Sequence, residues 1–147
     1  MKYYLAYGMN TNLQSMQERC PAAQSLGKVM LVGHTLEFRF HADIKVSDNQ
    51  VMECALWQIS DKCEQSLDAL EGYPHYYQKK SVQVQHNNHT IDCMIYYMVS
   101  ESALHIPPQQ YYDMVLQGYI QHKMMTAPVH QAYERALLST GYQYEET

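Results

Sequence analysis

The spacing of apolar residues along the chain predicts an alternation of short strands and amphipathic helices. Apolar runs and strict apolar–polar alternation are typical of strands, whereas recurrence at i, i+3, i+4 and i+7 is typical of helices. Six segments fit strands: 2–7, 29–32, 36–40, 51–59, 77–85 and 90–99. Four segments fit helices: 13–19, 60–72, 112–120 and 129–137. This order predicts an α+β fold in one domain, residues 1–147, with a small twisted sheet or partial β-barrel of about six strands and flanking helices.

Two polar segments are predicted to be turns between strands. Ser47-Asp48-Asn49 separates the strand that ends near Phe40 from the strand 51–59. His86-Asn87-Asn88-His89 joins the last two strands and predicts a hairpin. The HxxH spacing at this second turn could also bind a metal ion, but no third ligand lies nearby in the sequence. The hairpin interpretation is therefore preferred.

The predicted helix 60–72 ends on a carboxylate in an unusual position. Ser60 can cap its first turn and Gly72 stops its last one. Three apolar residues recur along one stripe: Cys63, Leu67 and Leu70. Glu71 falls on the same stripe, so apolar neighbours and the negative end of the helix dipole should raise its pKa. Such a carboxylate could act as a general base and then as a general acid near neutral pH. The stretch alone also admits a side chain that reaches past Leu67 into solvent.

A glycine turn connects the first strand to the first helix. Strand 2–7 breaks at Gly8, and Met9, Asn10, Thr11 and Asn12 precede the helix. A strand, a glycine turn and a helix start bring free backbone N–H groups together, and these can hold a carboxylate or a developing oxyanion. The same connection is also common in proteins where it has no function.

Composition and charge narrow the classes of partner. Ten Lys and Arg residues face fifteen Asp and Glu residues, a formal net charge of −5, so no broad cationic surface is available for nucleic acid. No window is apolar and long enough for a membrane span. The fourteen tyrosines suggest core packing, and a homodimer that buries some of them is compatible with this number.

The four cysteines are predicted to be reduced and buried. They are Cys20, Cys54, Cys63 and Cys93, and they stand far apart without the paired spacing of a zinc site. Reduced thiols, and the lack of a signal-like apolar segment at the amino terminus, predict a cytoplasmic protein. The sequence also contains no Gly-x-Ser-x-Gly elbow, P-loop or dinucleotide fingerprint. These features together predict a small-molecule site without a metal or cofactor.

Four segments, in order, resemble the gamma-glutamylcyclotransferase (AIG2-like) family over nearly the whole chain. The family's Tyr-Gly-Ser-Asn turn and Arg-x-Pro helix end are matched by YYLAYGMN and LQSMQERCP. Its Leu-x-Gly-(Tyr)-x-Leu-x-Phe strand is matched by LVGHTLEF. Its Leu-Asp-x-x-Glu-Gly segment, followed by Tyr and a basic strand, is matched by LDALEGYPHYYQKKSV. Its late Pro-x-x-Tyr segment, with a Gly seven residues after the Tyr, is matched by PQQYYDMVLQG.

The resemblance implies an enzyme that cyclises a gamma-glutamyl group without a metal or cofactor. In this reaction the α-amine attacks its own γ-carbonyl and releases 5-oxoproline and a free amine or amino acid, as in glutathione metabolism. Glu71 matches the family's catalytic glutamate and would serve as base and then acid. The implied substrate-binding residues are Tyr4, Leu5, Ala6, Tyr7, Gly8, Met9, Asn10, Tyr77 and Tyr111.

One residue departs from the family pattern. Met9 stands where the family has serine, and a thioether cannot donate the hydroxyl hydrogen bond. A binding module that retains the pocket without turnover is therefore the alternative to an enzyme. Tyr76 could also exchange roles with Tyr77. The leaving amine and the oligomeric state are left open by the sequence.

Overall fold

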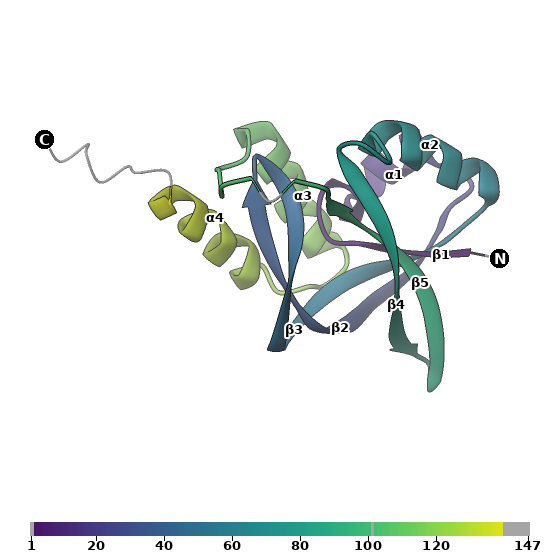
Figure 1. The fold of residues 1–147 in the computed structure, drawn as a ribbon. Coiled ribbons are helices and arrows are strands. Elements are labelled where there is room, and N and C mark those ends of the chain that lie inside the picture. The colour runs from purple at the N-terminus through teal and green to yellow at the C-terminus, as the bar shows by residue number, and fades with distance from the viewer. Residues whose placement is uncertain (1, 101, 140–147) are drawn as a thin grey trace, which may run out of the picture.

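The structure is a computed structural model that describes residues 2–100 and 102–139, and in this part of the chain one mixed five-stranded sheet is flanked by four α-helices (Figure 1). The strands are β1 (Lys2–Ala6), β2 (Gln24–Arg39), β3 (His41–Ile59), β4 (Tyr77–His86) and β5 (His89–Met98). The helices are α1 (Leu13–Arg19), α2 (Asp61–Glu71), α3 (Gln109–Gln121) and α4 (Ala127–Ser139), with a 3-10 turn, η1 (Met9–Thr11), after β1. The predicted α+β fold is confirmed.

The sheet order is β2-β3-β1-β5-β4, with β1 antiparallel to β3 and parallel to β5. This order places the first strand at the centre, where its apolar residues Tyr4 to Ala6 are buried. The carboxyl end of β1 therefore leads directly from the core into the turn at Gly8. In consequence, the most buried strand of the protein positions that turn.

Strands β2 and β3 are longer than the sequence predicted, and this explains why the sheet has five strands. Gly33 has a φ of 81°, which lets β2 bulge and continue where two separate runs were expected. At the bulge the pairing moves from Val32 opposite Val51 to His34 opposite Val46. The prediction of a turn between strands at 47–49 is wrong, because these residues lie within β3, at the point where its pairing with β2 is interrupted. The reversal lies at Phe40, whose φ is 72°.

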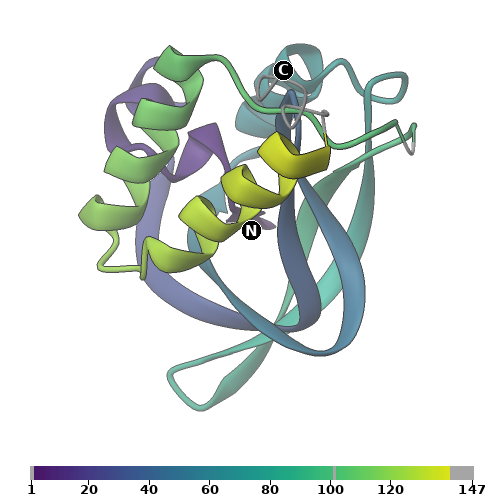
Figure 2. The same ribbon diagram turned by 90° about the vertical axis from the view of Figure 1, so that its left-hand side faces the viewer.

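The open sheet twists far enough for its two edge strands to approach each other. Lys80 Nζ of β4 lies 2.9 Å from His34 Nε2 of β2. The sheet therefore has the curvature expected of a partial barrel without closing its hydrogen-bond ladder. Helix α4 lies over β2, and α3 lies beside it against η1, as Figure 2 shows.

Helix α3 fixes the position of the turn after β1. A Cβ atom on Gly118 would lie 2.1 Å from Thr11 Oγ1 and 2.6 Å from the Asn12 nitrogen, so α3 can approach η1 this closely only with glycine there. Asn12 Nδ2 donates a hydrogen bond of 3.1 Å to the Met114 carbonyl of α3. The Gly8 turn therefore follows directly from the central strand, and α3 packs against it and holds it in position.

The predicted hairpin at 86–89 is confirmed. His86 pairs with His89, and both intervening asparagines have positive φ, as a tight two-residue turn requires. Within residues 2–100 and 102–139, no group of three or more His, Cys, Asp or Glu side chains could hold a metal ion. In the same part of the chain, no helix is both long and apolar enough to cross a membrane.

The prediction of four reduced thiols is wrong for two of them. Cys20, at the end of α1, forms a disulfide with Cys63 in the first turn of α2, with a Cα–Cα distance of 5.2 Å. The two residues are 43 positions apart and meet only because the sheet brings α1 and α2 together. Cys54 and Cys93 are free and buried, as predicted. Disulfides are rare in cytosolic proteins, so this pair counts against the cytoplasmic location, which stays a prediction.

Candidate active site

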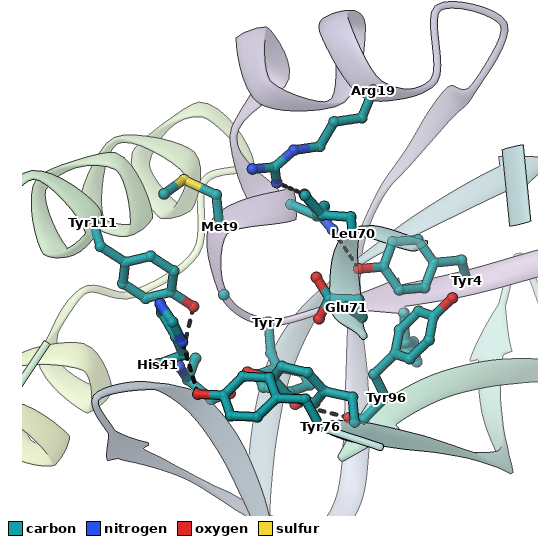
Figure 3. A pocket seen from close by; sticks show the side chains of 15 residues that line it. Tyr4, Tyr7, Met9, Arg19, His41, Leu70, Glu71, Tyr76, Tyr96 and Tyr111 are labelled. Atoms are coloured by element: carbon teal, nitrogen blue, oxygen red, sulfur yellow. Dashed lines mark hydrogen bonds between the residues drawn. The ribbon is translucent and has the colours of Figure 1, made fainter. Parts of the chain in front are cut away.

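Helix α2 delivers Glu71 to a pocket at its carboxyl end. Ser60 caps the first turn by accepting a 3.1 Å hydrogen bond from the Cys63 N–H. Gly72 ends the helix in the left-handed region, with a φ of 64°. Leu67 is fully buried against the core and fixes the rotation of the helix. Glu71 is therefore the last helical residue, and its carboxylate points into the pocket rather than past Leu67 into solvent (Figure 3).

The turn after β1 forms the opposite wall. A Cβ on Gly8 would lie 2.9 Å from the Ala42 Cβ and 3.1 Å from Tyr111 Oη, so the backbone comes close to both neighbours. Thr11 Oγ1 donates a 2.7 Å hydrogen bond to the Gly8 carbonyl and holds the turn in shape. The Met9 backbone N–H donates a hydrogen bond to Tyr111 Oη, and Met9 is one of the residues that line the pocket.

Asn10 is held at every polar group of its side chain. Its Nδ2 donates a 2.9 Å hydrogen bond to Tyr4 Oη, and its Oδ1 accepts one from Arg19 Nη1. The Asn10 carbonyl also accepts a 3.0 Å hydrogen bond from Trp57 Nε1. This network fixes the guanidinium of Arg19 at the edge of the pocket, where its remaining N–H groups can donate to a ligand.

The tyrosine hydroxyls around the pocket differ in what they have left to donate. Tyr77 Oη donates to the Ala42 carbonyl at 2.6 Å, and Tyr7 Oη donates to the Tyr96 carbonyl at 2.7 Å. Tyr111 Oη instead accepts from the Ala42 N–H at 3.0 Å. In the described part of the chain no acceptor takes the Tyr111 hydroxyl proton, so this proton is free for a ligand.

The pocket has a volume of about 200 Å³. It brings together most of the predicted site residues: Tyr4, Leu5, Tyr7, Gly8, Met9, Asn10, Glu71, Tyr77 and Tyr111. Ala6 is buried in the sheet and is not part of the lining. The ring of Tyr77 lines the pocket although its hydroxyl is engaged elsewhere.

Sequence reasoning missed several lining residues. They are Arg19, His41, Ala42, Leu70 and Tyr96, while Tyr76 was considered only as a substitute for Tyr77. Arg19 carried a signal, because it precedes the helix-ending proline of a quoted motif. His41 carried none, because it reaches the pocket only through the reversal at Phe40, which the sequence did not predict.

Burial controls the charge of Glu71. Loss of water raises the pKa of its carboxyl to about 7, and the positive charge of Arg19 opposes this rise. No described residue donates a hydrogen bond to the Glu71 carboxylate. A carboxyl group of this kind can both accept and return a proton near neutral pH.

Comparisons with known proteins identify relatives of this architecture. The family model described as gamma-glutamyl cyclotransferase, AIG2-like, matches residues 4–114. No curated protein sequence matches this chain. The matched region includes the Gly8 turn, Glu71 and Tyr111.

Solved structures share the fold at low sequence identity. One described as a gamma-glutamyl cyclotransferase aligns with a TM-score of 0.76 at 20% identity, over 89% of this chain and 85% of its own. YkqA from Bacillus subtilis aligns with a TM-score of 0.76 at 20% identity, over 92% of this chain and 54% of its own. An AIG2-like protein from Mus musculus aligns with a TM-score of 0.57 at 15% identity, over 69% of this chain and 80% of its own. At these identities the likeness concerns the fold alone.

Proposed function

This chain belongs to the gamma-glutamyl cyclotransferase, AIG2-like family, and on that premise we propose that it cyclises a gamma-glutamyl group. The α-amine of the substrate attacks its own γ-carbonyl, the γ-amide bond breaks, and 5-oxoproline and a free amine or amino acid are released. The observation that carries the proposal is the Glu71 carboxyl, which lies in the pocket with a raised pKa and no hydrogen-bond partner in the described chain.

The reaction begins with removal of a proton from the substrate ammonium. An α-ammonium has a pKa of about 8, so a base of pKa about 7 takes its proton at a cost of about 1.4 kcal/mol. At the ordinary glutamate value of 4.5 the same step would cost about 5 kcal/mol. Burial of Glu71 thus makes the carboxylate a competent base. The protonated Glu71 can then give the proton to the departing amine.

Binding must also place the amine against the γ-carbonyl. The Arg19 guanidinium suits the α-carboxylate of the gamma-glutamyl group, because it is the one cationic side chain among the described residues that line the pocket. The free proton of Tyr111 suits the developing oxyanion. The Met9, Thr11 and Asn12 N–H groups of the turn already donate hydrogen bonds within the protein. Because attack is intramolecular, holding this geometry supplies much of the rate.

The test is turnover by matched variants of two glutamates on helix α2. We expect the wild type to release 5-oxoproline from a panel of gamma-glutamyl dipeptides, gamma-glutamylamines and glutathione, measured by mass spectrometry. Glu71→Gln should lower kcat by about 100-fold or more. Glu64→Gln is the control, because Glu64 binds Lys2 and Lys79 outside the pocket. Equal turnover by Glu71→Gln and wild type would refute the role of Glu71.

Met9 is the observation that favours a second candidate function, a binding module without turnover. Met9 is a lining residue at the position where the family has a serine, and its thioether cannot donate a hydroxyl hydrogen bond. If substrates bind but no 5-oxoproline forms, Met9→Ser distinguishes the two functions. Turnover restored by serine would show that the hydroxyl is the missing part, whereas continued inactivity would leave binding as the function.

A further inference from the structure

The pocket has a buried end and an exposed mouth, and they lie on different sides of Glu71. The buried end contains Tyr4 and Asn10, each 4% exposed, and the half-buried Arg19 lies at its edge with its guanidinium hydrogen-bonded to Asn10. The mouth contains Tyr76, which is 45% exposed, and the half-buried His41. Figure 3 shows Arg19 and the His41–Tyr76 pair on opposite sides of the carboxylate. A gamma-glutamyl group held by Arg19 therefore directs its leaving amine toward the mouth.

The mouth is an aromatic surface held in place by a hydrogen bond. Tyr76 Oη and His41 Nδ1 lie 2.8 Å apart, and the two rings meet edge to face with centroids 5.8 Å apart. The ring of Phe40, which is 45% exposed, packs against His41 with centroids 5.0 Å apart.

The mouth also lacks charge. Arg19 and Glu71 are the only Lys, Arg, Asp or Glu side chains among the described residues that line the pocket. Burial lowers the pKa of His41, so its imidazole is neutral at pH 7. A leaving group with a carboxylate would find no cation among the lining residues there, and one with an ammonium would find no lining carboxylate apart from Glu71 itself. The charge of Asp43 also acts on Tyr76, but this carboxylate is buried and paired with Arg39. Either charge would lose water without compensation.

We propose that Tyr76 and His41 form a leaving-group subsite that selects an uncharged aromatic or apolar amine over an amine that carries a carboxylate or an ammonium group. This inference rests on the proposed cyclisation, because it assigns the mouth to the departing half of the same substrate. The selection arises from rejection of charge as much as from contact with the rings.

Matched substrates test the rejection of charge and the contact with the aromatic rings separately. Gamma-glutamyl-phenethylamide and gamma-glutamyl-phenylalanine differ only in a carboxylate on the leaving group. Gamma-glutamyl-butylamide and gamma-glutamyl-putrescine differ only in a terminal ammonium. We expect kcat/KM to be about tenfold higher for the uncharged member of each pair, and higher for phenethylamide than for butylamide.

Variants at the mouth identify the residues responsible. Tyr76→Ala should remove most of the preference for phenethylamide over butylamide, and Tyr97→Ala is the control because the half-buried Tyr97 lies beside Lys80 outside the pocket. His41→Arg places a permanent cation at the mouth. It should raise kcat/KM for gamma-glutamyl-phenylalanine relative to phenethylamide by about tenfold.

The same four compounds are also titrated calorimetrically into Glu71→Gln, so that selection is measured without turnover. If the wild type makes no 5-oxoproline but Glu71→Gln binds the uncharged members more tightly, cyclisation is refuted and the subsite stands. If turnover occurs with equal or better use of the charged members, cyclisation stands and the subsite is refuted. Failure of all four compounds to bind refutes the subsite as well.

Discussion

At the scale of the residue, Glu71 shows how a site can cost stability. The folded-state pKa of its carboxyl is about 7, above the ordinary value of 4.5. Between these values the folded protein binds more protons than the unfolded chain. The free energy of unfolding therefore falls as pH rises through this window, because an increasing fraction of the buried carboxyl must be ionised.

Glu71→Gln should remove this pH dependence. We expect the variant to gain about 2.5 kcal/mol relative to the wild type between pH 5 and pH 8, as an upper estimate from a pKa of about 7. Urea denaturation of both proteins at the two pH values measures the difference. If the free energies of unfolding of Glu71→Gln and the wild type differ by the same amount at pH 5 and at pH 8, the Glu71 carboxyl is solvated in solution.

Glu64 on the same helix provides a control of opposite sign. Hydrogen bonds from Lys2 and Lys79 lower the pKa of its carboxyl. Its contribution to stability is therefore present above the ordinary glutamate pKa and is lost as pH falls through the folded-state value. Glu64→Gln should accordingly be less stable than the wild type at pH 8, where Glu71→Gln gains.

The tyrosines show what could not be predicted at this scale. The sequence indicated Tyr77 and Tyr111 as equivalent substrate contacts, but the Tyr77 hydroxyl proton is engaged by the Ala42 carbonyl and the Tyr111 proton is not. The difference arises because the Ala42 carbonyl faces the Tyr77 hydroxyl, whereas the Ala42 N–H faces the Tyr111 hydroxyl. That geometry is set by tertiary packing and leaves no trace in residue spacing.

At the scale of the element, helices were predicted well because their ends carry local chemistry. Ser60 and Gly72 define α2 by capping alone, and Asn12 caps α1 by accepting from the Ser15 N–H at 3.1 Å. Strands β2 and β3 were predicted less well. The polar segment 47–49 resembles a turn in the sequence. It stays within β3 because β2 pairs with β3 on both sides of it, and this is visible only in the register on either side of Gly33.

Gly118 links helix α3 to the site, and its replacement should affect both stability and activity. Gly118→Ala would place Cβ 2.1 Å from Thr11 Oγ1, so we expect a loss of about 3 kcal/mol in the free energy of unfolding. Displacement of α3 would also move Tyr111 away from the Gly8 turn and lower kcat/KM. Urea denaturation and steady-state kinetics measure the two effects.

Ile120 provides the matched position on the same helix. Its side chain is 66% exposed, so Ile120→Ala should change the free energy of unfolding by no more than about 0.5 kcal/mol. Wild-type stability in Gly118→Ala would mean that α3 does not pack against the turn as closely as the structure shows.

At the scale of the whole molecule, the pocket is assembled from segments distant in sequence. Its lining comes from β1, the Gly8 turn, α1, β3, α2, β4, β5 and α3 and from the loop between α2 and β4. The sequence supplied residues of the right kind for most of this site. It could not place Arg19 beside Asn10 or pair Cys20 with Cys63, because both depend on how the sheet arranges α1 and α2.

A site assembled in this way should couple ligand binding to the unfolding of the whole described fold. A ligand at 100 times its Kd that binds only the folded state raises the free energy of unfolding by about 2.7 kcal/mol. We expect this rise when gamma-glutamyl-phenethylamide is added to Glu71→Gln, with the urea m value unchanged because the same surface is exposed on unfolding. Phenethylamine alone is the control, since it lacks the group that Arg19 and the Gly8 turn would bind. Two separate transitions, with only one shifted by the ligand, would show that the elements around the pocket unfold independently and that the site is not a property of the assembled sheet.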